Sequence, residues 1–229
     1  MSALLFNLKN VDIAYKNLIV LRQVNLQIDA GEKIVLVGPS DAGKTTLLKK
    51  LYQLRPQECG FIQQHFDLVK QLSVIDNIHL KRLDHFPIFF HLINIIQPQR
   101  RKIKRILPIL KTIGMEEKMS AKAGHLSNEQ QQRVAVGRAI YQDHPILLAD
   151  EPVAAMASSQ AEVILRALID TENTIIMALH SVELTLKYAQ RIVGLNSGCI
   201  RFDLPKEQVT PDHITDLYLR SCDKNPVRV

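Results

Sequence analysis

One stretch decides the fold of this 229-residue chain: Gly38-Pro39-Ser40-Asp41-Ala42-Gly43-Lys44-Thr45. It fits the pattern G-x-x-x-x-G-K-[ST] of phosphate-binding loops. A short apolar run, Lys33 to Val37, comes before it, and a segment with helical spacing, Leu47 to Leu54, comes after it. An ordinary glycine turn is the alternative, but a buried strand, a loop and a helix in that order are the context that a phosphate-binding loop requires.

The chemistry of such a loop is local. Small residues allow backbone N–H groups to turn inward around phosphate oxygens, and the helix N-terminus behind them adds a favourable partial charge. We expect the Lys44 ammonium to reach the β- and γ-phosphates and the Thr45 hydroxyl to coordinate Mg²⁺. The residues expected to hold the nucleotide in this loop are Gly38, Pro39, Ser40, Asp41, Ala42, Gly43, Lys44, Thr45 and Thr46.

A second apolar run, Ile146 to Ala149, ends in two carboxylates, Asp150 and Glu151. Asp150 is expected to hold the Mg²⁺ shell, and Glu151 to polarise a water for attack on the γ-phosphorus. By itself, an acidic pair after an apolar run is equally typical of a turn at a strand end. The upstream phosphate-binding loop favours the nucleotide site.

The rest of the chain alternates strands and helices. Strands are expected at residues 18–21, 24–28, 33–37, 145–149, 173–178, 192–195 and 199–202, and helices at 47–54, 158–170 and 182–190. Asn196-Ser197-Gly198 is a hairpin turn signal, and Thr210-Pro211 is expected to start a last helix. Apolar residues from Ile103 to Ile113 form one helical stripe, in which Pro108 is expected to kink or restart the helix.

The composition limits the kinds of partner and site that the chain can have. Lys and Arg (29) outnumber Asp and Glu (23), which gives a formal charge of +6 and a pI of 9.2. This charge permits nucleic acid or an anionic membrane as a partner without requiring either, and the basic run from Arg100 to Arg105 reads as a solvated helix face. The three cysteines are far apart, so neither a zinc site nor a disulfide framework is indicated. The N-terminus does not read as a secretory signal, and no apolar run reaches the ~20 residues that cross a bilayer.

Further motifs make the chain resemble the ATP-binding cassette (ABC) ATPases. Tyr15 resembles the aromatic residue that stacks on adenine, with an ordinary strand tyrosine as the alternative. Gln64 resembles the glutamine of the family's glutamine loop, which senses Mg²⁺ or the attacking water. Residues 126–139, LSNEQQQRVAVGRA, resemble the family signature and its helix, with Ser127 in the position that meets nucleotide. His180 resembles the switch histidine that contacts the γ-phosphate, although a lone histidine is usually structural.

The resemblance extends from about residue 8 to residue 198 and implies an α/β fold. A RecA-like P-loop NTPase core would contain a parallel or mixed sheet, a shortened antiparallel β segment and an inserted helical lobe. It implies a single ABC nucleotide-binding domain over residues 1–229, with the core at 1–64 and 136–205, the lobe at about 65–135 and a C-terminal helix at about 211–220. In the family, two cassettes dimerise head to tail, and each ATP lies between one subunit's phosphate loop and the other's signature.

The chain also departs from the family pattern. Asn128 and Glu129 stand where the signature has two glycines, and Glu129 is expected to bring a carboxylate toward phosphate. Ala157 stands where an aspartate usually follows the Walker B Glu-Pro. Asp41 replaces a glycine inside the loop, where aspartate tolerates positive φ better than most residues. The segment between the phosphate loop and the glutamine loop is short. We expect from these changes that the chain binds ATP, that a homodimer closes poorly and hydrolyses slowly, and that a heterodimer with an intact cassette keeps one competent site.

The resemblance implies an ATP-hydrolysing importer subunit with ATP and Mg²⁺ as cofactors. Residues 148–153 and 179–203 resemble most the ATPase subunits of phosphonate-type importers. The expected partners are transmembrane permease subunits, a second cassette and, indirectly, a solute-binding protein, but no nucleic acid. The expected location is peripheral, on the cytoplasmic face of the inner or plasma membrane, with Phe86 to Ile96 and the basic helix after it as the docking face. The alternatives are a degenerate cassette that binds ATP with little hydrolysis, in a heterodimer or as a regulator, and a cassette that acts on nucleic acid or the ribosome.

Overall fold

The structure, a computed structural model, describes residues 3–64, 66–80 and 99–219. The docking segment predicted at 86–96 lies outside these residues. The chain separates into two compact units, one of residues 1–61, 144–154 and 171–229 and the other of residues 62–143 and 155–170. The predicted helical lobe falls inside the second unit, and its exact boundaries stay a prediction.

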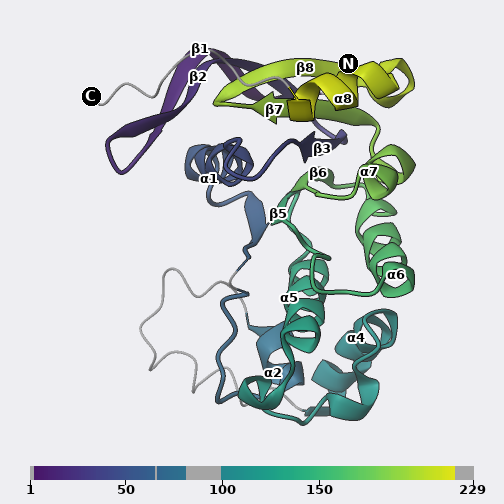
Figure 1. The fold of residues 1–229 in the computed structure, drawn as a ribbon. Helices are drawn as coiled ribbons and strands as arrows, with labels where there is room; N and C mark the ends of the chain where they lie inside the picture. Colours follow the sequence, from purple (N-terminus) through teal and green to yellow (C-terminus); the bar gives the residue numbers. More distant parts are fainter. Residues whose placement is uncertain (1–2, 65, 81–98, 220–229) are drawn as a thin grey trace. The chain divides into compact units, whose positions relative to one another are not determined.

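The first unit is built on a six-stranded sheet with the strand order β4-β5-β6-β3-β7-β8 (Figure 1). The strands are β3 (Lys33–Val37), β4 (Cys59–Ile62), β5 (Ile146–Asp150), β6 (Thr174–Ala178), β7 (Arg191–Asn196) and β8 (Cys199–Pro205). β3 pairs in parallel with β6 and β7, β5 pairs in parallel with β6, and β8 runs antiparallel to β7. This mixed sheet confirms the α/β fold that the resemblance implied.

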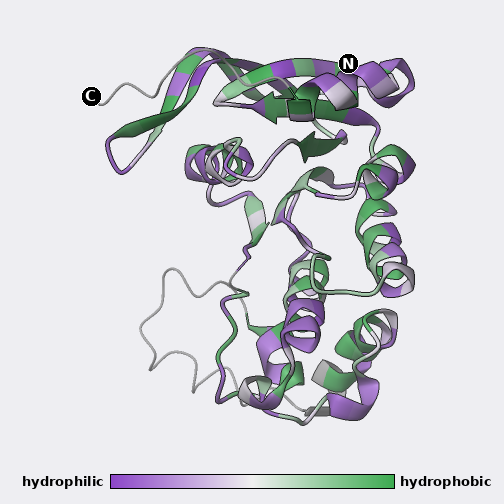
Figure 2. Ribbon diagram, viewed as in Figure 1, coloured by the Kyte–Doolittle hydropathy of each residue, from purple (hydrophilic) through white to green (hydrophobic). Residues whose placement is uncertain are grey.

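The central strands are apolar except for one polar residue at an end of each, Lys33, Asp150 and Thr174, because both of their faces are covered. Every residue of β3, β5 and β6 is buried, and the apolar colour of β3 in Figure 2 reflects this. Continuous apolar runs are typical of such strands, whereas half-exposed strands alternate polar and apolar residues. The strands predicted at 33–37, 145–149 and 173–178 are therefore confirmed.

An N-terminal hairpin forms a separate two-stranded sheet from β1 (Leu4–Tyr15) and β2 (Leu18–Asp29). Its turn residues Lys16 and Asn17 have φ of 47° and 64°, as a two-residue hairpin turn requires. The two strand segments predicted at 18–21 and 24–28 prove to be one strand. The chain passes between them through Gln23 at φ 47°, and the Gln23 N–H donates to the Asp12 carboxylate at 2.7 Å.

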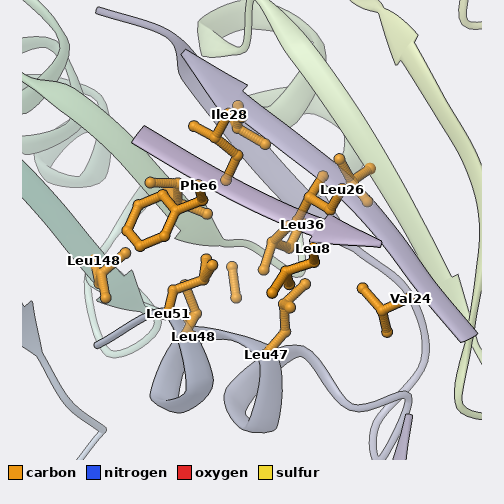
Figure 3. Close-up of a cluster of buried hydrophobic side chains, with 14 of the residues drawn as sticks. Phe6, Leu8, Val24, Leu26, Ile28, Leu36, Leu47, Leu48, Leu51 and Leu148 are labelled. Atoms are coloured by element: carbon orange, nitrogen blue, oxygen red, sulfur yellow. The ribbon is translucent and has the colours of Figure 1, made fainter. Parts of the chain in front are cut away.

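The core of this unit lies where the hairpin, the sheet and helix α1 (Lys44–Leu54) meet (Figure 3). Leu47, Leu48 and Leu51 have no exposed surface, and they face apolar side chains of β1, β2 and β3. Burial of each leucine contributes roughly 1.5–3 kcal/mol. This packing fixes the start of α1, and with it the phosphate-binding loop, against the sheet.

The C-terminal part of the first unit follows the predicted pattern. Helix α7 (Val182–Tyr188) precedes β7, and η4 (Lys206–Gln208) and helix α8 (Pro211–Leu219) follow β8. Ser197 and Gly198 connect β7 to β8 with φ of 48° and 76°, which confirms the predicted hairpin. The Thr210 hydroxyl accepts the N–H of His213 at 3.4 Å, so the last helix starts where the sequence predicted.

The described part of the second unit is helical. Its elements are α2 (Val74–His79), α4 (Gln99–Thr112), η2 (Glu116–Lys118), η3 (Ala123–His125), α5 (Asn128–Gln142) and α6 (Ser158–Ile169). Ile106, Leu110 and Ile113 are fully buried, which confirms the predicted stripe of α4. The restart expected at Pro108 does not occur, because the helix continues through this residue. Pro108 lies on the exposed face, where water can satisfy the carbonyl that a proline leaves without a donor.

Candidate nucleotide-binding site

The phosphate-binding loop connects the carboxyl end of β3 to the first turn of α1. Gly43 is the N-cap of α1 in a left-handed conformation with φ of 102°. Asp41 is also left-handed, at φ 62°, so aspartate adopts the backbone geometry that a glycine would. A loop with such residues exposes backbone N–H groups beside a helix N-terminus, which is a ready-made anion site.

The first glycine of the loop is required by a close approach. Gly38 has φ of 147°, and a Cβ placed on it would lie 1.9 Å from the Leu195 carbonyl oxygen of β7. No side chain fits at this distance. Tyr218 of α8 also lies near this residue: burial raises the pKa of Tyr218, and its interaction with the Gly38 backbone opposes that shift. The C-terminal helix therefore helps to hold the base of the loop, a contact that no sequence signal predicted.

Lys44 folds back over the loop. Its Nζ donates to the carbonyl oxygens of Gly38 at 2.7 Å and Pro39 at 2.9 Å. Burial lowers the pKa of Lys44, and the negative charges of Glu151, Asp150 and Asp41 oppose that shift. The ammonium is thus held at the loop entrance by carbonyl groups, which a phosphate oxygen can replace as a stronger, charge-assisted partner.

The first turn of α1 meets the end of β5 through Thr45 and Asp150. The Thr45 hydroxyl donates to Oδ2 of Asp150 at 2.8 Å, and Asp150 is buried. A hydroxyl and a carboxylate are hard oxygen donors, the kind that Mg²⁺ takes together with phosphate oxygens and water. The two predicted metal ligands on this unit therefore lie together and fit Mg²⁺.

Glu151 and His180 also come together. Glu151 follows β5, with φ of 54° and its N–H bonded to the Ala178 carbonyl at 3.1 Å. His180 comes two residues after the end of β6, and its Nε2 contacts Oε1 of Glu151. His180 is half exposed, whereas the Glu151 side chain is only 16% exposed. The pair places an acid–base couple beside Asp150, because parallel neighbouring strands end at the same edge of the sheet.

Tyr15 lies at the end of β1 with its ring half exposed. The Nζ atoms of Lys49 and Lys16 lie 5.4 Å and 5.6 Å from the ring centroid. Lys49 belongs to α1, so the aromatic ring lies beside the helix that carries the phosphate-binding loop. The half-exposed ring interacts with both ammonium groups, and its stacking on adenine stays a prediction.

The predicted signature segment lies in the second unit. Ser127 is the N-cap of α5: its hydroxyl accepts the Gln130 N–H, and the Gln130 side chain accepts the Ser127 N–H in return. This arrangement is a capping box. Glu129 forms an ion pair with Arg133, one turn further along the same helix. The carboxylate that was expected to turn toward phosphate is therefore paired within α5.

Two functional candidates of the second unit were missed by the sequence analysis. Arg138 of α5 donates to the carbonyl oxygens of Phe66 and Asp67, both at 2.8 Å, just after the exposed Gln64. The other is Arg133. Because it follows Glu129 by four residues, the sequence could have predicted an ion pair between them on a helix. The contact of Arg138 with a loop 71 to 72 residues away could not be predicted in this way. The roles of Gln64 and Ser127 stay predictions.

Together, the mixed sheet, the loop between β3 and α1 and the acidic end of β5 define a P-loop nucleotide-binding protein. The chain belongs to the ABC transporter family, whose model matches residues 21–154, more than half of the chain. Within this family it is an ATP-hydrolysing cassette, which confirms the resemblance seen in the sequence.

Relatives and solved structures agree with this assignment. The phosphonates import ATP-binding protein PhnC of Rhizobium johnstonii is 31% identical, over 93% of this chain and 86% of that protein. The protein PhnC 3 of Halalkalibacterium halodurans is 34% identical, over 93% of each chain. A solved dimeric ATP-binding cassette in a post-hydrolysis state, bound to ADP and Pi, is 27% identical with a TM-score of 0.72, over 90% of this chain and 99% of that one. None of the helices in the described ranges is long and apolar enough to cross a membrane.

Proposed function

We propose that this chain hydrolyses Mg²⁺-ATP to drive the import of phosphonate or a related oxyanion through a membrane permease. The observation that carries the proposal is the similarity, over nearly the whole chain, to cassettes named as phosphonate import proteins. The site supports the first half of the proposal, because the loop, a lysine and two carboxylates lie in one compact unit. The solute itself is inferred from the relatives' names.

Each proposed site residue of the first unit has a role in the reaction. Backbone N–H groups of residues 40–46 bind the phosphates, and Lys44 exchanges its carbonyl partners for phosphate oxygens. Thr45 and Asp150 hold Mg²⁺, which supplies Lewis-acid stabilisation of the charge on the phosphates. Glu151 orients and deprotonates the attacking water, and His180, which contacts Glu151, stabilises the γ-phosphate. Tyr15 stacks on adenine.

Two residues of the second unit complete the proposed machinery. Gln64 senses Mg²⁺ or the attacking water, and Ser127 binds the γ-phosphate of ATP held by a second cassette. The Ser127 hydroxyl lies at the N-terminus of α5, where the helix dipole favours an anion. This assignment needs a second cassette in either a homodimer or a heterodimer. The solved relative, which is dimeric and bound to ADP and Pi, supports it.

The other partners follow from import. We propose that permease subunits place the chain at the cytoplasmic face of the membrane, and that a solute-binding protein delivers the oxyanion to the permease. In this scheme, ATP closes the pair of cassettes and hydrolysis reopens it, so each cycle moves the permease between two states.

The experiment is reconstitution of the chain with the permease and solute-binding protein of its own genome in lipid vesicles. Hydrolysis and uptake are measured with methylphosphonate, phosphate, sulfate and an uncharged sugar. We expect methylphosphonate or phosphate to stimulate both readouts. A Glu151→Gln control should bind ATP but lose hydrolysis by roughly 10²–10⁴-fold, the usual contribution of a general base. Stimulation by the sugar alone, or by no oxyanion, would rule out the proposed solute class.

A further inference from the structure

The ion pair between Glu129 and Arg133 bears on whether the altered signature segment can still bind a phosphate group. Glu129 is the second residue of α5, directly after Asn128, and belongs to its first turn. Side chains in an α-helix lean toward its N-terminus. The positive end of the helix dipole also attracts a carboxylate there. Without a partner, the Glu129 carboxylate would therefore lie at the terminus where a phosphate group is proposed to bind.

Arg133 draws this carboxylate in the opposite direction. Its Cα lies four residues, about 6 Å, further along the helix axis. An acidic residue that precedes a basic one by four positions has the favourable order for a helical ion pair. Its Nη2 contacts Oε1 of Glu129. The negative charge is thus both neutralised and moved away from Ser127.

The guanidinium of Arg133 is largely shielded from solvent and lies against Gly114. Its side chain is 19% exposed, against 36% for Glu129. Its Nη1 lies so close to Gly114 that a Cβ there would be only 3.3 Å away. Its Nε–H is buried and has no hydrogen-bond partner within the described ranges. An apolar side chain would avoid this desolvation cost, so packing alone does not explain an arginine at this position.

We infer that Arg133 is a positioning residue that holds the Glu129 carboxylate off the N-terminus of α5, so that this terminus can accept the γ-phosphate of ATP on a second cassette. The inference rests on the proposed function of Ser127. It accounts for a glutamate at a place where the negative charge alone would repel phosphate, because the charge is paired inside the same helix.

The test is a charge-rescue series in the full-length chain: Arg133→Met, Glu129→Gln and the double variant. Steady-state hydrolysis gives kcat and KM, and calorimetry with ATPγS gives binding to the chain's own loop. We expect Arg133→Met to lower kcat at least ~10-fold, a barrier increase of about 1.4 kcal/mol, with nucleotide affinity unchanged. Glu129→Gln should leave kcat at the wild-type value or above it, and the double variant should recover to the Glu129→Gln value.

The rescue separates positioning from structure. If Arg133 serves only to stabilise the fold, the double variant stays as slow as Arg133→Met, and the inference is overturned. Equal rates for Arg133→Met and the wild type overturn it as well. Should Arg133→Met fail to fold, as a melting curve will show, Arg133→Lys retains a cation within reach of Glu129 and should retain the rate better than Arg133→Gln.

A second readout does not depend on turnover. Sedimentation with Mg²⁺-ATPγS measures nucleotide-dependent association of two chains. The inference expects association to weaken in Arg133→Met and to return in the double variant. A chain that binds ATPγS and associates, but shows no transport with its permease, would contradict the proposed function and still support this inference. Association that is insensitive to both substitutions would contradict the inference and leave the proposed function standing.

Discussion

The hydroxyl of Thr45 donates a 2.8 Å hydrogen bond to Oδ2 of Asp150, a residue 105 positions later in the chain. The bond joins the first turn of α1 to the end of β5. It brings two oxygen donors together at the edge of the sheet where the phosphate-binding loop begins. The two oxygen donors of the proposed metal site on this unit thus lie together in the fold, and the carboxylate can be tested by substitution.

Asp150→Asn retains the shape of the side chain and removes its charge. We expect hydrolysis to fall by about 10² or more, because a metal ion contributes several kcal/mol of charge stabilisation to phosphoryl transfer. A titration of activity against Mg²⁺ should show a weaker apparent metal affinity. Calorimetry with metal-free ATP is the control, and it should change little. Unchanged Mg²⁺ dependence would mean that Asp150 is not a metal ligand.

The lowered pKa of Lys44 predicts a pH dependence of nucleotide binding. Burial favours the neutral amine in the free protein, whereas a bound triphosphate favours the ammonium, so binding raises the pKa again. Where the free lysine is partly neutral, binding takes up a proton. The affinity for ATP should therefore fall as the pH rises toward the ordinary lysine value of about 10.4.

Calorimetry in two buffers of different ionisation enthalpy measures this proton uptake directly. Lys44→Arg is the matched control, because a guanidinium stays charged throughout the range. At alkaline pH, Lys44→Arg should take up fewer protons on binding ATP than the wild type does, whatever its affinity for ATP. Identical proton uptake in both proteins would assign the effect to another group.

Arg138 predicts a coupling between α5 and the segment after Gln64. Its two bonds to the carbonyl oxygens of Phe66 and Asp67 hold this segment. Hydrogen bonds from a charged group contribute about 1.5–3 kcal/mol each. Arg138→Met should increase hydrogen exchange of the amides around residues 66–69. If Gln64 acts on Mg²⁺ or the attacking water as proposed, Arg138→Met should also lower kcat more than it lowers the affinity for ATP.

Arg138→Lys distinguishes charge from geometry. A lysine retains the charge but lacks the planar fork that donates to two acceptors at once. We expect it to restore only part of the protection. Exchange that is unchanged in both variants would show that the segment is held by other contacts.

Arg191 predicts a stability effect that is separate from catalysis. Its Nε and Nη2 donate to the two oxygens of Asp203 at 2.6 Å and 2.7 Å, and its Nη1 donates to Glu32 at 2.9 Å. These bonds raise the pKa of Arg191. The side chains are partly exposed, so we expect Arg191→Met to lower the free energy of unfolding by about 1.5–3 kcal/mol and no more. Urea denaturation measures this, and ATP affinity of the folded protein should not change.

The sequence determined much of the fold and part of the site. Periodicity predicted the buried strands, the stripe of α4 and the β7–β8 hairpin, because burial and turn geometry are local demands on residue type. The loop from Gly38 to Thr45 was readable for the same reason: small residues and a lysine at fixed spacing are needed for one local backbone shape. Thr45 and Asp150 were each expected to meet Mg²⁺, and the structure adds the hydrogen bond between them. The restart predicted at Pro108 was wrong because the cost of a proline in a helix depends on which face of the helix meets water, whereas the kink stays a prediction.

The tertiary structure was needed to show how the fold accommodates the residues that depart from the family signature. In the sequence, Asn128 and Glu129 indicate that the two glycines of the family signature are missing. The spacing of Glu129 and Arg133 permits an ion pair within a helix, but only the folded chain shows that the pair forms and that the guanidinium fits against Gly114. Likewise, no local pattern links Arg138 to Phe66, or Tyr218 to Gly38. The physical reason is the range of the interactions: strands, turns and loops follow from neighbours in the chain, whereas the energy of a charge depends on what the fold brings within a few ångströms of it.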